Sequence, residues 1–255
     1  LDKHMQIFRS YIRTHNDHWR FTAGRFGWEQ GSGNVMDTTV DGIRLTTGMP
    51  KDYVHLFVGR MGREQDRREG FILEGRKNWR KWDYLGAFYN VHKDAGESHP
   101  WNKQKIVSNR LTYHFNDKLN ASYEHLWSEG RTVTLGQTNN MRHEHGYMLR
   151  LVYGGYDYTK KDSYRLRLMY YHQPQSSIIS HTMNGFPALF DGDDMSGNSK
   201  GFALGMKCFG FNYDWVIRKG VLLTVEAYDL RNIHSHKYFR DVHQQVIGAS
   251  LTFVI

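Results

Sequence analysis

The sequence "HQQVIGASLTFVI" (residues 243–255) alternates between apolar and small or polar side chains from Ile247 onward. Its apolar positions are Ile247, Ala249, Leu251, Phe253 and Ile255, and Gly248, Ser250 and Thr252 lie between them. A period of two predicts a β-strand with one apolar face and one wet face. Because the apolar face persists to the last residue, we expect that face to contact hydrocarbon.

The same alternation recurs along the chain. In "YMLRLVY" (147–153) and "YRLRLMYY" (164–171), arginine alternates with leucine and tyrosine. An arginine at every second position is incompatible with a sheet that is buried on both faces, since an unpaired buried charge is costly. One face of each strand must therefore meet water.

About thirteen such strands are predicted, and most are roughly ten residues long, as expected for a tilted strand that crosses a bilayer. They cover residues 4–13, 18–27, 36–48, 52–62, 69–77, 82–92, 104–115, 118–128, 144–155, 163–173, 201–217, 221–230 and 245–255. The sequence has no run of about 18 apolar residues, which excludes a transmembrane helix.

Short and long connections alternate between these strands. The short ones are 14–17, 49–51, 77–81, 116–117, 157–162 and 218–220, and the long ones are 28–35, 63–68, 93–103, 129–143, 174–200 and 231–244. Aromatic residues lie near the strand ends, among them Trp19, Tyr53, Trp79, Trp82, Phe115, Trp127, Tyr153, Tyr156 and Trp215. Short turns on one side, long loops on the other and aromatic girdles are typical of outer-membrane barrels.

Composition is compatible with this interpretation and excludes others. The formal net charge is +8 and the mean hydropathy is −0.68. Most arginines stand singly within alternating segments rather than in runs, which argues against a nucleic-acid-binding protein. The single cysteine, Cys208, excludes an intrachain disulfide framework and a cysteine zinc site.

Two segments resemble bacterial outer-membrane porins. They are "WRFTAGRFGWEQGSGNVMDTTVDGIRLTTG" (19–48) and "KGFALGMKCFGFNYDWVIRKGVLLTVEAYDLRN" (200–232), the second similar to the penultimate porin hairpin with its tight basic turn. The nearest likeness is to the porins of diderm Firmicutes, which carry an S-layer-type domain ahead of the barrel. The resemblance implies an all-β, transmembrane, antiparallel up-and-down β-barrel in the bacterial outer membrane. It also implies contact with membrane lipid and lipopolysaccharide, a homotrimer, and small hydrophilic solutes as cargo.

The strand count leads to an expectation about the whole barrel. Residues 1–255 read as a single barrel domain. Bacterial single-chain barrels have an even number of strands. Thirteen strands therefore predict a native total of 14 or 16, with at least one strand, or an upstream domain, before residue 1.

The face opposite the apolar positions is expected to line the pore. Its candidate residues are Arg20, Arg44, Glu74, Arg76, Arg110, His114, Glu124, Arg150, Arg165, Arg167, Lys207, Asp214 and Glu226, with His55 on the same face. Cations outnumber anions by about two to one, which in a water-filled pore favours anions. The alternative is that Arg–Glu pairs only stiffen the wall. His125 falls on the apolar side and breaks the pattern.

The longest loop, 174–200, is a candidate constriction. Phe186, Leu189 and Phe190 are expected to anchor it on the wall, unless it covers the mouth. Asp191, Asp193 and Asp194 offer oxygen ligands, but Met195 falls where a calcium loop places its third ligand. We expect no metal and no cofactor.

Enzymatic motifs are missing from the sequence. It contains no G-x-S-x-G elbow, P-loop or dinucleotide-binding turn. "RHEHGY" (142–147) offers His143, Glu144 and His145 as a metal trio if it lies in a loop. Three functional hypotheses result: a passive diffusion channel, a selective channel or exporter for anionic sugars or polymers, and a soluble β-sandwich that binds polysaccharide.

Overall fold

The computed structural model describes residues 9–29, 35–48, 51–61, 68–92, 101–134, 137–181, 205–233 and 243–254. They form one all-β sheet whose main path has thirteen antiparallel strands in chain order. The strands are β1 (Ser10–His15), β2 (Trp19–Glu29), β3 (Met36–Gly48), β4 (Tyr53–Met61), β5 (Arg68–Trp79), β6 (Trp82–His92), β7 (Trp101–His114), β8 (Leu119–Thr134), β9 (Gln137–Gly155), β10 (Tyr164–Gln173), β12 (Met206–Arg218), β13 (Val221–Asn232) and β14 (His243–Phe253). Each corresponds to one predicted strand.

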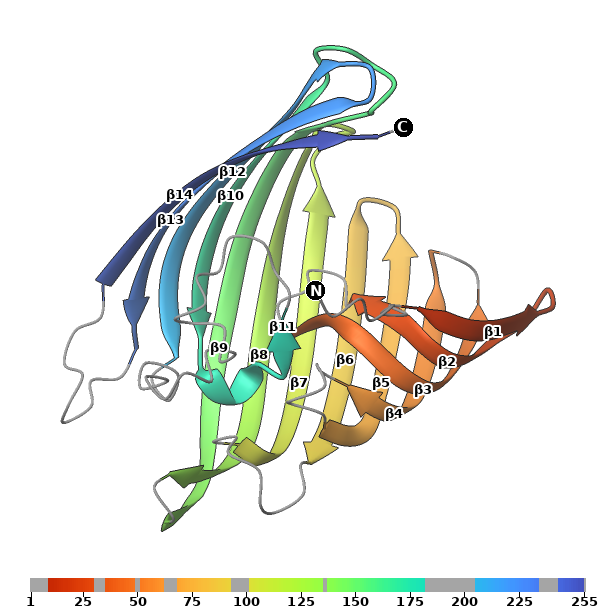
Figure 1. The fold of residues 1–255 in the computed structure, drawn as a ribbon, viewed down its shortest axis with the longest axis vertical. Helices are drawn as coiled ribbons and strands as arrows, with labels where there is room; N and C mark the ends of the chain where they lie inside the picture. Colours follow the sequence, from red (N-terminus) through yellow and green to blue (C-terminus); the bar gives the residue numbers. More distant parts are fainter. Residues whose placement is uncertain are drawn as a thin grey trace, which may run out of the picture.

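The sheet curves into an open trough, with β1 and β14 as its two edges (Figure 1). Within the described residues these two strands are not paired with each other, so the model does not show a closed ring. The expected total of 14 or 16 strands stays a prediction. A β-sandwich needs two packed sheets, whereas the described strands form a single one. No helix among the described residues has the length and apolar composition needed to cross a membrane.

The β8–β9 hairpin corrects one predicted loop. Residues 129–143 were expected to form a long connection, but β8 continues to Thr134 and β9 begins at Gln137. The strands stay in register as far as Thr134 and Gln137, with one irregularity between Gly130 and Thr132. The polar composition of this stretch misled the prediction, because cross-strand pairing continues beyond the apolar part of the hairpin.

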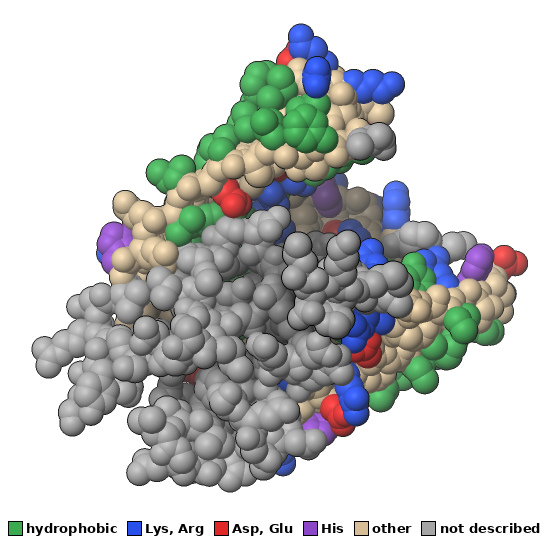
Figure 2. All heavy atoms as spheres, viewed as in Figure 1, with side chains coloured by type: hydrophobic (Ala, Val, Ile, Leu, Met, Phe, Trp, Pro, Cys, Tyr) green, Lys and Arg blue, Asp and Glu red, His purple; other side chains and the backbone are tan. Residues whose placement is uncertain are grey.

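Alternation along each strand gives the sheet two chemically distinct faces. The inner face carries the buried side chains, such as Phe26, Ile72 and Leu126. The outer face carries exposed apolar side chains, such as Leu149 and Ile247. Figure 2 shows hydrophobic side chains on the outside of the trough and blue Lys and Arg side chains in its hollow.

The short connections lie together at one end of the sheet, which we call the turn side; the other end is the loop side. Asn16 and Asn116 each stabilise a tight turn, because their Oδ1 atoms accept hydrogen bonds from backbone N–H groups two and three residues ahead. Asp52 accepts hydrogen bonds from Lys77 Nζ and the Asn78 backbone N–H, both at 2.7 Å. The Lys77 contact first, then the Asn78 contact, lowers the pKa of the Asp52 carboxyl below its ordinary value.

After β10 the chain turns into the hollow instead of continuing as a strand. Residues 174–181, which we call the strap, contain a 3-10 helix, η2 (Gln175–Ser177), and the two-residue strand β11 (Ser180–His181). η2 contacts β7, β8 and β9, and β11 pairs in parallel with the start of β3 (Figure 1). The strap therefore joins opposite walls of the trough at its loop side.

A row of glycines crosses the wall formed by β2–β5. Gly24, Gly42, Gly59 and Gly70 pair in succession from β2 to β5. A Cβ atom on Gly42 would lie 2.3 Å from the Val58 carbonyl oxygen and 2.9 Å from Cε2 of Phe57. Only glycine allows the backbones and the Phe57 ring to come this close, so the row fixes the shape of this wall.

Candidate functional site

The loop-side half of the inner face is a packed apolar core. Strap residues Ile178 and Ile179 are buried there against side chains from both walls. The core also includes Phe26, Met36, Met61, Ile72, Tyr89, Ile106, Leu126, Tyr171, Met206 and Leu230. The Ile179 backbone N–H donates a hydrogen bond to the Val35 carbonyl at 3.0 Å. In this half of the hollow the strap packs against the walls.

Buried polar groups fasten the strap to the wall beneath it. Gln104 Nε2 donates to the carbonyl oxygens of Ser176 and Ile178, each at 2.9 Å, and Gln104 Oε1 accepts a hydrogen bond from Arg68. The Ser176 hydroxyl lies 2.6 Å from the Ser128 hydroxyl and donates to Glu144 Oε2 at 2.5 Å. Buried polar groups are tolerated only when they are satisfied, so this network specifies one position for the strap.

The turn-side half of the inner face is charged. Arg76 on β5 makes a two-point contact with Asp83 on β6, with Nε–Oδ1 at 3.0 Å and Nη2–Oδ2 at 2.5 Å. On β10, Arg165 Nη2 lies 2.7 Å and Arg167 Nη2 3.4 Å from Asp214 Oδ2 of β12. These ion pairs link neighbouring strands and hold the guanidinium groups against the wall.

Between these regions, β2–β5 bring aromatic and charged groups together. The Arg44 guanidinium carbon lies 4.8 Å from the ring centroid of Phe26 and 5.3 Å from that of Trp28, within cation–π range. The Tyr53 hydroxyl donates to Glu74 Oε1 at 2.7 Å. Tyr53 therefore lies on the inner face, which corrects its expected place in the outer aromatic girdle.

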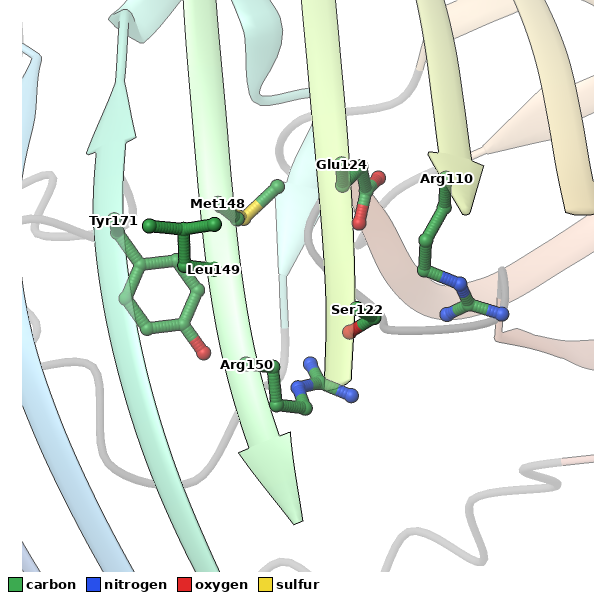
Figure 3. A pocket seen from close by; sticks show the side chains of 7 residues that line it. All are labelled: Arg110, Ser122, Glu124, Met148, Leu149, Arg150 and Tyr171. Carbon is green, nitrogen blue, oxygen red and sulfur yellow. The ribbon is translucent and has the colours of Figure 1, made fainter. Parts of the chain in front are cut away.

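A shallow pocket on β7–β10 places two arginines around a carboxylate. It is lined by Arg110, Ser122, Glu124, Met148, Leu149, Arg150 and Tyr171. Figure 3 shows the Arg150 side chain extending from β9 toward Ser122, with Arg110 on the other side. Glu124 Oε1 accepts a hydrogen bond from Ser108 at 2.6 Å. The Glu124 carboxylate interacts electrostatically with Arg110, and the Arg150 guanidinium lies against the Tyr171 hydroxyl.

All but one of the thirteen candidate residues lie on the inner face. The exception is Lys207, which is exposed on the outer face and pairs in register with His172 and Arg231. Its strand carries apolar residues on both sides: Met206 and Cys208 belong to the buried core, while Phe209 is exposed. The alternation there gave no clear face, and the assignment of Lys207 to the inner face was wrong.

Two other sequence-based hypotheses concern metal binding and constriction. His143, Glu144 and His145 belong to β9, where alternation turns Glu144 inward and both histidines outward, so they form no trio. Within the described part of the chain, no group of three or more His, Cys, Asp or Glu residues is arranged to hold a metal. Phe186, Leu189, Phe190, Asp191, Asp193 and Asp194 lie outside the described residues.

Sequence reasoning missed several inner-face residues. Asp83, which holds Arg76, follows the alternation of "WDYLGAFYNVH" (82–92) and was accessible to the same parity argument. Gln104 and Ser176 were not accessible in this way, because their role depends on the strap returning across the hollow.

Comparison with known proteins adds little. No family model matches the sequence, and no curated protein matches it either. A solved structure of the NanC porin, in a rhombohedral crystal form, aligns with 96% of this chain and 97% of its own, at 9% sequence identity and a TM-score of 0.44. Identity and TM-score are both too low for this likeness to carry an argument about function.

Proposed function

We propose that this chain is an outer-membrane porin, in which the sheet closes into a cylinder around a water-filled passage for small hydrophilic solutes and ions. One observation carries the proposal: the distribution of polar and apolar side chains is inverted relative to a soluble protein. Arg110 and Glu124, on the inner face, are only 9% and 2% exposed, whereas Leu149 and Ile247, on the outer face, are 49% and 83% exposed.

The inverted distribution favours a membrane over water as the surroundings of the outer face. Soluble monomers rarely expose contiguous apolar patches of more than a few hundred Å². Here exposed apolar side chains recur on strand after strand, including Ile43, Leu45, Val58, Leu73, Leu111, Leu151, Leu168 and Leu251. Exposed aromatic rings such as Trp19, Trp79, Trp82, Phe115, Tyr153 and Tyr164 lie near the turn side, where an interfacial girdle belongs. A soluble polysaccharide-binding protein has no use for such a surface.

The inner face favours a passage that is charged at the turn side and narrowed by the strap at the loop side. The arginines of the inner face outnumber the carboxylates beside them: Arg44, Arg76, Arg110, Arg150, Arg165 and Arg167 lie with Glu74, Asp83, Glu124 and Asp214. Arginines that are not neutralised attract anions to a water-filled pore. The proposed pore therefore prefers anions weakly.

Planar-bilayer recording tests both parts of the proposal. In a salt gradient, the purified protein is expected to give discrete conductance steps and a reversal potential on the anion-selective side. The double variant Arg110→Gln/Arg150→Gln should roughly halve the anion-to-cation permeability ratio. The matched control is Arg25→Gln/Arg60→Gln, two arginines on the outer face that pair with Asp41 and Glu69. Absence of conductance contradicts the porin, and a cation-selective potential contradicts the anion preference.

The paired position of Arg110 and Arg150 in one pocket favours, as a second candidate, a channel selective for anionic sugars. The two guanidinium groups outnumber the single carboxylate of Glu124 in this pocket, which suits a ligand that carries a carboxylate. Addition of galacturonate oligomers should then block chloride current in a saturable manner in the parent protein. Equal block of the Arg110→Gln/Arg150→Gln variant contradicts this candidate and leaves the passive pore.

A further inference from the structure

The loop side of the outer face carries a basic row that interrupts the apolar surface. Cross-strand pairing places its members side by side from β8 to β14: His125, Tyr147, His172, Lys207, Arg231 and His243. Each is directly opposite the next in the antiparallel register, and all belong to the outer face. We call this set the outer basic row.

The row is closely packed at its β8–β10 end. His125 Nε2 lies 3.1 Å from Nδ1 of His145, a further outward histidine of β9. The rings of Tyr147 and His172 stack in parallel at a centroid distance of 5.0 Å. These rings lie along the outer face, and Nδ1 of His172 is turned away from solvent.

The β12–β14 end of the row holds permanent positive charge. Lys207 and Arg231 are directly opposite each other, and like charges in that position destabilise a sheet. Asp229 is shared between Arg231 at 3.5 Å and His243 at 2.9 Å, and Lys207 has no acidic partner within the described part of the chain. One carboxylate for this group of cations leaves an uncompensated positive charge, which an external anion would neutralise.

The height of the row matches a membrane boundary. His172 lies eight positions along β10 from the exposed Tyr164, and Lys207 eight positions along β12 from Trp215. At about 3.3 Å per residue and a tilt of about 40°, this places the row roughly 20 Å above the turn-side aromatic residues. The apolar band of an outer-membrane barrel is about 25 Å tall, so the row falls near its far edge.

We propose that the outer basic row binds the phosphate groups of anionic lipids in the loop-side leaflet. The inference rests on the proposed function, because it requires the outer face to lie in a membrane. The charge, the height and the continuity with the apolar surface all fit a layer of phosphates immediately above hydrocarbon. The same row gives Lys207, which lies outside the inner face, a role on the lipid side.

Lipid selectivity measured by electron spin resonance tests the proposal. The protein is reconstituted into phosphatidylcholine vesicles with a trace of spin-labelled phosphatidylglycerol or spin-labelled phosphatidylcholine, and the motionally restricted fraction gives their relative association constant. We expect the parent protein to favour phosphatidylglycerol about fivefold, as one surface cation can supply. In Lys207→Gln/Arg231→Gln the ratio should approach one. High salt should weaken the parent's preference.

The control is Lys160→Gln/Lys161→Gln, which removes the same charge from the exposed turn between β9 and β10. This control is expected to keep the fivefold preference. An unchanged ratio in Lys207→Gln/Arg231→Gln, or an equal loss in the control, overturns the proposal. The proposal is also overturned if Lys207→Gln/Arg231→Gln changes the oligomeric state measured by sedimentation without changing the lipid preference. That result indicates that the row contacts a protein partner instead.

Conductance distinguishes failure of this inference from failure of the proposed function. A protein that conducts in bilayers but shows no preference for phosphatidylglycerol retains its function as a porin and contradicts only the lipid site. A protein that does not insert into vesicles contradicts both. The variant Lys207→Arg keeps the charge and should keep the preference, which separates a charge effect from a folding defect.

Discussion

The two halves of the hollow are built from the same strands but are stabilised differently. At the loop side, the inner face buries Ile178 and Ile179 of the strap against apolar side chains of both walls. At the turn side, the same strands present Arg76, Asp83 and other charged groups in ion pairs between neighbours. The difference shows that one alternating strand supports a packed core at one end and a charged wall at the other, depending on what covers it.

The largest loss of stability is expected from a substitution in the loop-side half of the hollow. Gln104→Leu should lower the free energy of unfolding by about 2–4 kcal/mol, because the buried carbonyls of Ser176 and Ile178 lose their donor and Arg68 loses an acceptor. Urea titration in detergent micelles measures this loss. Single-channel conductance should rise as the strap detaches.

The matched control for Gln104 is Gln245→Leu on the outer face, whose Nε2 donates a hydrogen bond to the exposed Asp229 at 3.1 Å. This substitution should change the unfolding free energy by less than about 0.5 kcal/mol. If Gln104→Leu loses no more stability than Gln245→Leu, the hydrogen bonds of Gln104 to the strap contribute little, and the contrast between the two halves disappears.

A smaller effect is expected in the turn-side half. Asp83→Asn should cost about 1–3 kcal/mol, because Asp83 is buried and its two-point contact with Arg76 is weakened, although Arg76 is itself partly exposed. The substitution also adds net positive charge to the inner face. The reversal potential in a salt gradient should therefore move further toward anion selectivity.

Asp117→Asn, in the exposed turn between β7 and β8, is the control for Asp83 because it makes the same charge change outside the hollow. It should alter neither stability nor selectivity appreciably. If Asp117→Asn moves the reversal potential as far as Asp83→Asn does, general surface charge rather than the inner wall determines selectivity.

The smallest effect is expected at the turns themselves. The pKa of Asp52 is lowered in the folded protein, so its hydrogen bonds to Lys77 and Asn78 stabilise the fold above the ordinary aspartate pKa. This contribution is lost as the pH falls through the lowered value. Asp52→Asn should remove that part of the acid dependence: the variant loses a little stability at neutral pH, where the pair is exposed and weak, and none below the lowered pKa. Urea titrations at pH 7 and pH 3 measure the difference, and an unaltered acid dependence would contradict it.

Much of the fold follows from the period of two. Alternation in "YMLRLVY" and "YRLRLMYY" identifies both the strands and the two faces, so Arg150, Arg165 and Arg167 were assigned to the inner side correctly. Parity fails where both faces are apolar, as around Lys207, because the burial of Met206 and Cys208 depends on a core that is distant in the sequence. The alternation also does not tell how far along the strand, from the turn side to the loop side, the inner face changes from charged to apolar. The division of the hollow depends on the strap, whose path from β10 to β3 has no local signal.

The path of the strap has a consequence for how the chain assembles. Ser180 and Met36 are distant in the sequence, yet β11 can pair with β3 only after the intervening strands have brought the two walls to face each other. Contacts of such long sequence separation form late and slowly. Burial of the strap therefore requires a sheet that has already curved. A sheet that has not bent far enough leaves Ile178 and Ile179 exposed, where chaperones and proteases can bind them.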